Sequence, residues 1–368
     1  MSNIFNNQIQ PGIYQPGVSI DDLQLIIEKT PANVWDMLRG RRIFITGGTG
    51  FIGCWLLEAL IWSNEQLGLG ISISVLSRQP NNFIAKAPHL ATHNIIHLVQ
   101  GNTNDLARLE GEYDVVIHAA TDVANANSDP LAVFDDIVNG TKQTLEFARR
   151  SKAKCYLLTS SGAVYGSQPS QLTHVSENYN IAPDTMAIGS AYGQGKRISE
   201  WLCRYYSDQH GLDVKIARCF ALLGPYLPLD AHFAAGNFIR DGLRNQPIHV
   251  NGNGSPYRSF LYAADMVIWL LTIMINGQSS QPYNVGSDSE ITIKGLAETV
   301  SEIIYGENKV AIASPVPTLS PQRYVPDVNK VKNELGLQIY TDLKSSLNKT
   351  IDWETKKYTQ INPDQSND

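Results

Sequence analysis

Several features that define common protein classes are missing from this chain of 368 residues. Only four cysteines are present, and none of them forms a Cys-x-x-Cys pair: Cys54, Cys155, Cys203 and Cys219. Such a scatter argues against a disulfide framework or a zinc ribbon. It is typical of a protein from a reducing compartment such as the cytoplasm.

The chain also lacks long runs of charge or of apolar residues. Its 29 Lys and Arg residues are interspersed with 35 Asp and Glu residues, so we expect no nucleic-acid partner. The longest apolar run, residues 266–275, is far shorter than the roughly 20 residues that a membrane-spanning helix needs. The N-terminus has neither the basic nor the apolar region of a secretory signal. We therefore expect a cytoplasmic protein without a membrane partner.

From residue 42 onward, strand-like runs alternate with helical patterns, and this alternation predicts the fold. Helical periodicity is clearest over residues 51–62 and 130–151. Strands that alternate with helices indicate an α/β fold with a doubly wound parallel sheet of the Rossmann type. The strand-like runs are RRIFIT, ISISVLS, NIIHLV, DVVIHAA, KCYLLTS and VKIARCF.

The chain divides into four parts on the same evidence. Residues 1–40 form an N-terminal extension, which is expected to pack on the surface through amphipathic pieces at residues 20–29 and 34–38. The last residues, NPDQSND, are expected to be disordered because they carry nothing to bury. The parts are an N-terminal extension (1–40), a dinucleotide-binding domain (41–221), mainly a smaller α/β substrate lobe (222–355) and a tail (356–368).

A glycine-rich loop, T-G-G-T-G-F-I-G, joins the first predicted strand to the first predicted helix. Glycines at this place permit a tight turn and let backbone N–H groups approach a pyrophosphate. Because the strand–loop–helix context is the one that such a loop requires, we predict a dinucleotide site. Its residues are Gly47, Thr49, Gly50, Phe51, Ile52 and Gly53, of which the three glycines hold a G-x-x-G-x-x-G spacing.

The end of the second strand indicates which dinucleotide is bound. An acidic residue there binds the ribose 2′-hydroxyl of NAD, whereas an arginine accommodates the 2′-phosphate of NADP. This chain has Ser77 and Arg78 at that place and no acidic residue nearby. We therefore favour NADP(H). NAD(H) is the alternative, and in that case Arg78 is only a solvated charge.

A tyrosine, a lysine and a serine form the predicted reaction centre. Tyr192 and Lys196 are four residues apart at the start of a helical segment, so they face the same way. A free tyrosine has a pKa near 10, and a neighbouring ammonium helps it to exchange a proton near neutral pH. Ser161 ends the fifth strand and can hold the reacting oxygen. Gly193 and Gly195 are expected to leave room for the cofactor.

Histidines at intervals of four residues do not predict a metal site. Pro88 precedes His89 and His93, and His97 lies in a strand-like run, so the three do not share one helix. We expect no metal.

In this order, the motifs TGGTGFIG, DVVIHAA, SSGAVYG and YGQGK resemble the extended short-chain dehydrogenase/reductase family. That family comprises nucleotide-sugar epimerases, dehydratases, decarboxylases and ketoreductases, and the resemblance extends over about residues 41–340. It implies that Lys196 also binds the nicotinamide ribose. It further implies that Asn102, Ala119 and Ala120 border the adenine and its ribose.

The helix after Lys196 carries Trp201, Tyr205 and Tyr206 at helical spacing. Such a cluster belongs either to the core or to a subunit interface. In the family two such helices from each subunit pair, so the resemblance implies a homodimer.

The second lobe resembles the family's clamp for a nucleoside diphosphate. The matching segments are residues 236–245, 247–260 and 321–327, and the matching residues are Asn237, Arg258 and Arg323. Guanidinium groups form paired hydrogen bonds to phosphate oxygens, as a pyrophosphate site needs. This region is most similar to the UDP-glucuronate decarboxylases.

Four positions depart from the family pattern. The 4,6-dehydratases have an Asp-Glu pair after the catalytic Ser or Thr, and the decarboxylases keep the Glu, but this chain has Gly162 and Ala163. Neither residue transfers a proton, which argues against dehydration and weakens the decarboxylase interpretation. Ala221 and Ile137 replace two asparagines of the family, and Ala221 removes a usual sugar or phosphate contact.

The chemistry that remains is hydride transfer at a carbinol or ketone carbon of a nucleotide-diphosphate sugar, with C4 as the expected position. We predict a ketoreductase or an epimerase. A first alternative is an enzyme like the UDP-glucuronate decarboxylases or the 4,6-dehydratases that takes its acid from elsewhere. A second alternative is a non-catalytic dinucleotide sensor.

Overall fold

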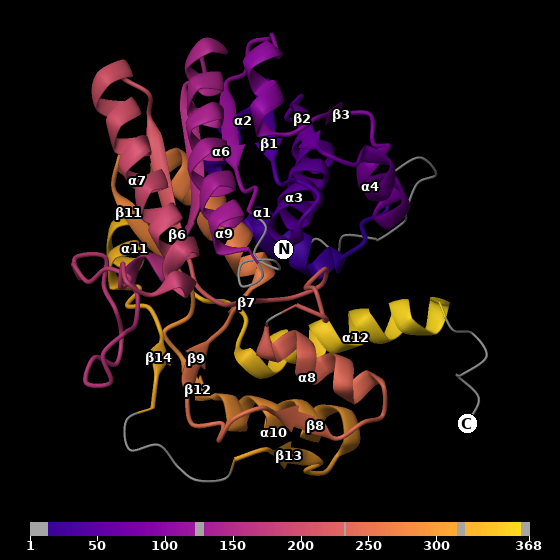
Figure 1. Cartoon of the computed structure of the whole chain (residues 1–368). Coiled ribbons are helices and arrows are strands. Elements are labelled where there is room, and N and C mark those ends of the chain that lie inside the picture. Colours follow the sequence, from indigo (N-terminus) through magenta and orange to yellow (C-terminus); the bar gives the residue numbers. More distant parts are fainter. Residues whose placement is uncertain (1–13, 122–128, 232, 315–320, 362–368) are drawn as a thin grey trace.

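The computed structural model describes residues 14–121, 129–231, 233–314 and 321–361. Figure 1 shows a sheet covered by helices in its upper part and a smaller lobe below. The disorder expected for residues 362–368 lies outside the described residues. Within the described ranges, no helix combines the length and the apolar character needed to cross a membrane.

The described residues form a main sheet of seven parallel strands in the order β11-β6-β5-β4-β1-β2-β3, which confirms the predicted doubly wound fold. Six strands are those that the sequence predicts. The sequence does not predict β11, which is four residues long and begins with Pro282, a residue tolerated at the sheet edge that β11 forms. The strands are β1 (Arg42–Thr46), β2 (Ser72–Ser77), β3 (Ile96–Gln100), β4 (Val115–His118), β5 (Cys155–Ser161), β6 (Val214–Cys219) and β11 (Pro282–Val285).

The strand order reverses between β1 and β4, so the crevice for a ligand opens at the carboxyl ends of these two strands. The register pairs Thr46 with His118, which places both strand ends at one level. His118 is buried there beside Thr46, whose hydroxyl lies 2.7 Å from His118 Nδ1. Burial lowers the pKa of His118 to about 3, so the ring is neutral.

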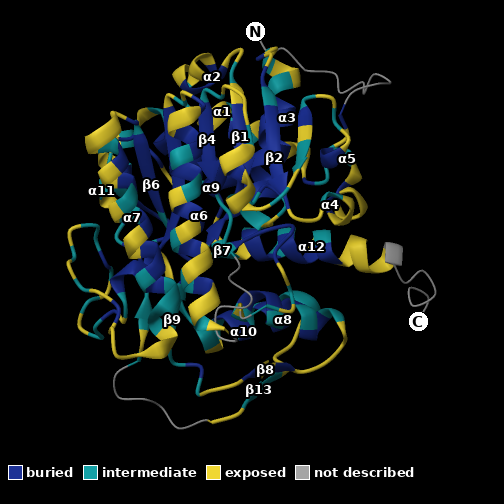
Figure 2. Cartoon of the chain, turned by 45° about the horizontal axis from the view of Figure 1, so that its top comes forward, coloured by how far each residue is buried: buried dark blue, intermediate teal, exposed yellow. Residues whose placement is uncertain are grey.

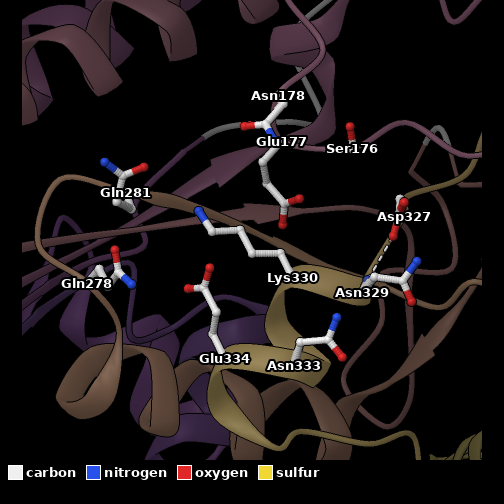
Figure 3. Close-up of a pocket in the computed structure, with 10 residues that line it drawn as sticks. All are labelled: Ser176, Glu177, Asn178, Gln278, Gln281, Asp327, Asn329, Lys330, Asn333 and Glu334. Carbon is white, nitrogen blue, oxygen red and sulfur yellow. Dashed lines mark hydrogen bonds between the residues drawn. The ribbon is translucent and has the colours of Figure 1, made fainter.

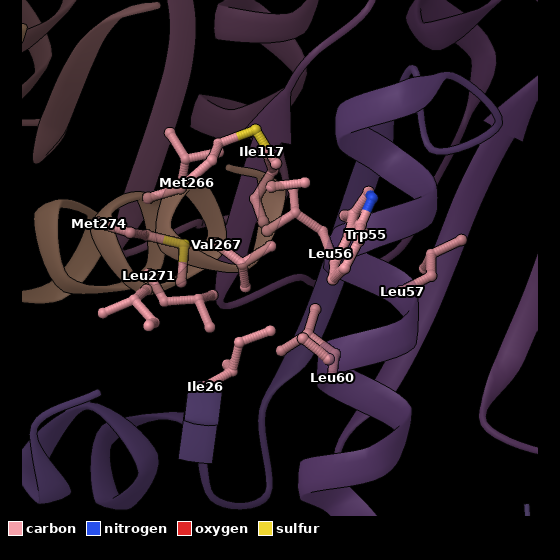
Figure 4. Packing of buried hydrophobic residues seen from close by; sticks show 14 of the residues in the cluster. Ile26, Trp55, Leu56, Leu57, Leu60, Ile117, Met266, Val267, Leu271 and Met274 are labelled. Atoms are coloured by element: carbon pink, nitrogen blue, oxygen red, sulfur yellow. The ribbon is translucent and has the colours of Figure 1, made fainter. Parts of the chain in front are cut away.

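Helices cover both faces of the sheet because side chains alternate along each strand. On β1, Ile43 and Ile45 join the hydrophobic cluster on one face, and Phe44 joins the cluster on the other. Figure 4 shows the first cluster, where Trp55 and Met266 lie among apolar side chains from α3 and α9. Figure 2 shows the buried strands between helices whose outer sides are exposed. The main covering helices are α3 (Phe51–Leu67) and α9 (Ala263–Asn276) on one face, and α6 (Pro130–Arg150) and α7 (Ala191–His210) on the other.

The N-terminal extension forms two helices, α1 (Ile20–Lys29) and α2 (Ala32–Leu38), at the two amphipathic pieces of the sequence. Each helix packs one face onto the main domain, where Leu23 and Ile26 are fully buried in the same cluster as Trp55. Burying several large aliphatic side chains removes enough apolar surface to make the extension part of the main core.

The smaller lobe is built from two stretches of chain. Residues 263–285 fall inside the predicted lobe, but they form α9 and β11 and return to the main sheet. The lobe has its own apolar cluster around Phe238 and Leu296. Its elements are β7 (Leu222–Leu223), α8 (Ala234–Leu243), β8 (Ile248–Val250), β9 (Tyr257–Ser259), β10 (Leu261–Tyr262), β12 (Glu290–Thr292), α10 (Ile293–Tyr305), β13 (Val310–Ile312), β14 (Arg323–Tyr324) and α12 (Leu343–Ile361). Helix α11 (Asn329–Leu335) follows β14 but packs against β11 and α9 of the main domain.

Short helices and turns complete the connections between these elements. They are α4 (Pro80–Lys86), α5 (Pro88–Ala91), η1 (Thr103–Arg108), η2 (Gly162–Tyr165) and η3 (Ile188–Ser190).

Candidate active site

The glycine loop runs from the end of β1 to the start of α3 and has no room for side chains at two of its glycines. Gly47 has a φ of +74°, and a Cβ there would lie 2.4 Å from the Ala119 carbonyl carbon. A Cβ at Gly53 would lie 2.3 Å from the Gly47 oxygen. Gly50, in contrast, is exposed at the N-cap of α3. The loop therefore packs against Ala119 and leaves the N-terminus of α3 accessible, as a pyrophosphate site requires.

The residues predicted to surround the adenosine lie around this loop. Ser77 ends β2, and Arg78 follows it with an exposed side chain that pairs with no carboxylate of the described residues. Lys86, at the end of α4, donates from Nζ to the Thr49 carbonyl at 2.8 Å, which adds a second cation beside the loop. Asn102 is the N-cap of η1, where its side chain accepts a hydrogen bond from the Asn104 N–H at 2.8 Å.

Tyr192 and Lys196 lie in the first turns of α7, which packs against β5 and so brings them to the strand end that carries Ser161. Lys196 donates from Nζ to Thr121 Oγ1 at 2.7 Å and to the Thr159 carbonyl at 2.8 Å. The same Nζ lies 6.0 Å from the centroid of the Tyr192 ring. The structure thus brings the three predicted reaction-centre residues together.

The electrostatics of this group follow from its burial. Burial lowers the pKa of Lys196 to about 8. Burial also raises the pKa of Tyr192 to about 12, and a hydrogen bond from Ser161 acts in the opposite direction. In the protein alone the tyrosine is therefore protonated at neutral pH and is poised to donate a proton.

The two glycines between Tyr192 and Lys196 make room for protein, not for a cofactor. A Cβ on Gly193 would lie 2.6 Å from the Ala163 carbonyl oxygen. A Cβ on Gly195 would lie 3.2 Å from the Ile137 side chain of α6. The expectation that these glycines leave space for the dinucleotide is wrong, because the chain itself fills that space.

The predicted phosphate ligands lie in the lobe below the sheet and differ in their partners. Arg323 forms an ion pair with Glu290, and its guanidinium lies 4.1 Å from the Tyr257 ring centroid. Arg258 is half-buried, and burial lowers its pKa. Within the described part of the chain, no carboxylate pairs with Arg258, whose Nη1 donates to the Tyr257 carbonyl at 2.8 Å. A desolvated guanidinium of this kind is suited to a phosphate.

Two cavities lie away from Ser161 and Tyr192. Asn237 lines one of about 380 Å³ together with Arg240 and His249, and its Oδ1 accepts a hydrogen bond from Arg240 Nη1 at 3.1 Å. The other, of about 440 Å³, is shown in Figure 3 and is lined by Glu177, Lys330 and Glu334 among others. None of the residues predicted for the site lines this second cavity.

Two residues that the sequence analysis does not single out lie beside the reaction centre. Glu200 accepts hydrogen bonds from Ser160 Oγ at 2.6 Å and from Arg218 Nη2 at 2.7 Å. Its spacing of four residues from Lys196 is a signal that could have indicated it. Tyr324 lies 3.5 Å from Ser161 Oγ through its hydroxyl, and no local pattern indicates a contact between residues 163 positions apart.

Comparison with known proteins gives relatives over most of the chain. UDP-glucuronic acid decarboxylase 6 of Arabidopsis thaliana is 32% identical over 83% of this chain and 86% of the relative. UDP-glucuronic acid decarboxylase 1 of Xenopus tropicalis is 29% identical over 86% of this chain and 73% of the relative.

Solved structures with lower identity show the same fold. UDP-glucose 4-epimerase of Thermotoga maritima, solved with UDP-glucose, has a TM-score of 0.73 at 21% identity, over 86% of this chain and 99% of that chain. A dTDP-glucose 4,6-dehydratase of Streptomyces venezuelae, solved with NAD, has a TM-score of 0.74 at 22% identity, over 88% of this chain and 99% of that chain.

A family model described as the NAD dependent epimerase/dehydratase family matches residues 43–286, from β1 to the end of β11. The matched residues include the glycine loop and the Ser161, Tyr192 and Lys196 group. The chain therefore belongs to the NAD dependent epimerase/dehydratase family.

Proposed function

We propose that this protein is an NAD(P)-dependent enzyme that transfers a hydride at a carbinol or ketone carbon of a nucleotide-linked sugar. The position we favour is C4, and the reaction is a ketoreduction or an epimerisation. The observation that carries the proposal is the position of Ser161, Tyr192 and Lys196 at the same end of the sheet as the glycine loop. A bound nicotinamide would accept or return the hydride, and its oxidised ring would add positive charge.

Residues of the chain itself transfer the proton. Tyr192 donates a proton to the oxygen of a ketone that is being reduced, and it takes the proton back from a carbinol that is being oxidised. Ser161 hydrogen-bonds Tyr192 and holds the reacting oxygen. Lys196 keeps its ammonium at this end of the sheet through Thr121 and the Thr159 carbonyl.

The nucleoside diphosphate is proposed to bind in the lobe below the sheet, through Asn237, Arg258 and Arg323. Arg258 supports this best, because it is desolvated and has no carboxylate partner among the described residues. Arg323 would have to exchange Glu290 for a phosphate oxygen.

A second candidate function is decarboxylation of UDP-glucuronic acid. The relatives that are named UDP-glucuronic acid decarboxylases favour it, at 32–33% identity in three Arabidopsis thaliana proteins. Oxidation at C4 gives a β-keto acid, which loses carbon dioxide, so the same proton-transfer group serves this reaction. Gly162 and Ala163 count against it because neither side chain exchanges a proton.

One experiment distinguishes these functions. Nicotinamide absorbance is followed while the protein meets NADPH and a panel of 4-keto nucleotide sugars, with parallel incubations of UDP-glucose and UDP-glucuronic acid with NAD⁺. Stoichiometric loss of reduced cofactor supports the ketoreductase. A new sugar isomer without net cofactor change supports the epimerase, and release of carbon dioxide supports the decarboxylase. If all three are absent, the non-catalytic alternative gains support.

We propose that the cofactor is NADP(H), held at its 2′-phosphate by Arg78 and assisted by Lys86. Replacing Arg78 with alanine is expected to weaken NADPH binding by roughly 10- to 100-fold, since a hydrogen bond to a charged group contributes about 1.5–3 kcal/mol. NADH binding is expected to stay unchanged. Fluorescence titration with both cofactors measures this.

The control for Arg78→Ala is Arg244→Ala, which removes an exposed arginine of the distant substrate lobe. Its NADPH affinity should equal that of the wild type. Equal NADPH and NADH affinities in the wild type, unaltered in Arg78→Ala, would refute the NADP assignment.

A homodimer is proposed through α6 and α7. Trp201 is 60% exposed, stacks on Tyr205 at 5.7 Å between ring centroids and lies on the same helix as the exposed Ile198. Leu131 on α6 is also 70% exposed. A patch of exposed apolar side chains on one helix face, such as that of Ile198, Trp201 and Tyr205, marks an interface.

Replacing Trp201 with glutamate is therefore expected to weaken dimerisation by about 2 kcal/mol or more, or roughly 30-fold, because interface tryptophans contribute on that scale. Light scattering after gel filtration, over a range of concentrations, measures the dissociation constant. Met37→Glu is the matched control, since Met37 is 52% exposed on α2. A wild-type protein that stays monomeric at all concentrations contradicts the dimer.

The cytoplasm is the proposed location. All four cysteines are buried and unpaired, which supports a reducing compartment.

A further inference from the structure

The space beside Ser161 is occupied by an aromatic hydroxyl from the far end of the chain. Gly162 follows Ser161 and has no side chain. A Cβ built on Gly162 would lie 2.7 Å from the Tyr324 hydroxyl oxygen and 2.7 Å from two ring carbons of Phe220. Tyr324 and Phe220 therefore fill the place that a larger residue at position 162 would need.

The Tyr324 hydroxyl belongs to the same hydrogen-bonded group as the predicted reaction centre. It lies 3.5 Å from Ser161 Oγ, and the Ser161 hydroxyl also hydrogen-bonds Tyr192. Ser161 thus lies between two phenols that reach it from different parts of the fold, Tyr192 from α7 and Tyr324 from β14.

The backbone and the ring of Tyr324 are both fixed in place. Strand β14 pairs with β9, with Tyr324 opposite Arg258, and Figure 1 shows these two strands side by side below the sheet. The next residue, Val325, donates its N–H to Gln168 Oε1 at 3.0 Å. The Tyr324 ring lies 4.7 Å from the Phe220 ring centroid and 6.0 Å from the Arg258 guanidinium.

Tyr324 therefore connects the two sites that the proposed function requires. Its hydroxyl faces Ser161, where a reacting carbon would be held, and its ring faces Arg258, where a phosphate would be held. A sugar attached to that phosphate has to pass Tyr324 to reach Ser161. Burial raises the pKa of Tyr324, so its hydroxyl keeps its proton and is available as a neutral donor.

We propose that Tyr324 is a positioning residue that donates a hydrogen bond to an oxygen of the sugar next to the reacting carbon. This inference rests on the proposed function, because it needs a nucleotide-linked sugar between Arg258 and Ser161. A neutral phenol orients a sugar oxygen without the carboxylate that removal of a hydroxyl group requires. Together with Gly162, it makes this end of the site suited to hydride transfer without dehydration.

The test compares binding of UDP-glucuronic acid with binding of UDP, which lacks the sugar. Replacing Tyr324 with phenylalanine removes only the hydroxyl oxygen. We expect UDP-glucuronic acid to bind about 3- to 10-fold more weakly, as the loss of one neutral hydrogen bond predicts, and UDP to bind as before. Unchanged UDP affinity also shows that the variant is folded. Isothermal titration calorimetry with the full chain measures both.

The matched control is Tyr257→Phe. Tyr257 lies on β9 in the same small sheet and stacks under Arg323, so the control makes the same substitution away from Ser161. It should bind both probes as the wild type does, or weaken both equally.

A second variant approaches the same contact from Ser161. Gly162→Ala places a methyl group where the Tyr324 hydroxyl lies. It is expected to weaken the binding of UDP-glucuronic acid and to leave the binding of UDP unchanged. Equal effects on both probes, or no effect in Tyr324→Phe, overturn the positioning role and leave the proposed function standing. A wild-type protein that binds neither probe contradicts a uridine-nucleotide sugar as the substrate, and the inference with it.

Discussion

Replacing Tyr192 with phenylalanine is expected to reduce kcat by between about 100- and 10,000-fold, the range that general acid–base catalysis contributes. The variant loses only the phenolic oxygen that exchanges a proton with the substrate. Burial raises the pKa of this phenol to about 12, so it is a proton donor in the protein alone. We expect no other substitution that removes a single side-chain heavy atom to reduce turnover as strongly.

Cofactor affinity is expected to remain in Tyr192→Phe, because Lys196 keeps its bonds to Thr121 and Thr159. Two measurements separate the effect on turnover from the effect on cofactor affinity. They are single-turnover kinetics, with the substrate found in the panel, and a cofactor titration. Tyr205→Phe is the matched control, since Tyr205 lies on the same helix with an exposed ring. Turnover that survives in Tyr192→Phe would rule out the proposed proton donor.

The largest effect on stability is expected from Glu58→Gln. Glu58 lies on α3 with no exposed surface. Its carboxylate accepts hydrogen bonds from the Tyr14 hydroxyl at 2.5 Å, the Tyr226 hydroxyl at 2.5 Å and the Gly17 N–H at 3.0 Å, and His89 Nε2 lies 2.9 Å away. These contacts join the N-terminal extension, the main domain and the smaller lobe.

A glutamine has one acceptor oxygen in place of two and brings an NH₂ group among donors. Since each hydrogen bond to a charged group contributes about 1.5–3 kcal/mol, we expect a loss of about 3–6 kcal/mol in the free energy of unfolding. Guanidinium chloride unfolding, followed by tryptophan fluorescence, measures this loss. The transition midpoint falls while the slope m, the dependence of the free energy of unfolding on denaturant concentration, stays the same.

Glu65→Gln is the matched control for this change. Glu65 lies on the same helix and accepts from the Tyr14 N–H at 3.2 Å, but 26% of its side chain is exposed, so water can replace what is lost. We expect a loss below about 1 kcal/mol there. Similar losses in both variants would show that the buried Glu58 contacts do not hold the extension in place.

The fold could be predicted from the sequence wherever its cause is local. Alternating strand-like and helical runs gave six strands of the main sheet, because periodicity and β-branched content act over a few residues. The strand β11 could not be found this way. Its four residues carry a proline, and only pairing with β6 makes them a strand.

The extension shows a similar limit. Amphipathic periodicity predicts α1 and α2 at their observed places, but it does not say what their apolar sides cover. They are part of the main core because α3 and α9 present apolar side chains to them. An amphipathic pattern shows that one face of a helix is buried, but it does not identify the element that covers this face.

The sequence by itself determined which residues are available for the proposed chemistry. The glycine loop and the Ser161, Tyr192 and Lys196 set follow from residue type and spacing, and Gly162 and Ala163 remove the family's acid side chains. Tertiary structure alone decided what surrounds that chemistry. It placed the Tyr324 hydroxyl beside Ser161 across 163 positions of chain, and it filled the space at Gly193 and Gly195 with protein. The physical reason is that spacing along the chain fixes neighbours within one helix or loop, whereas contacts between distant segments depend on how whole elements pack.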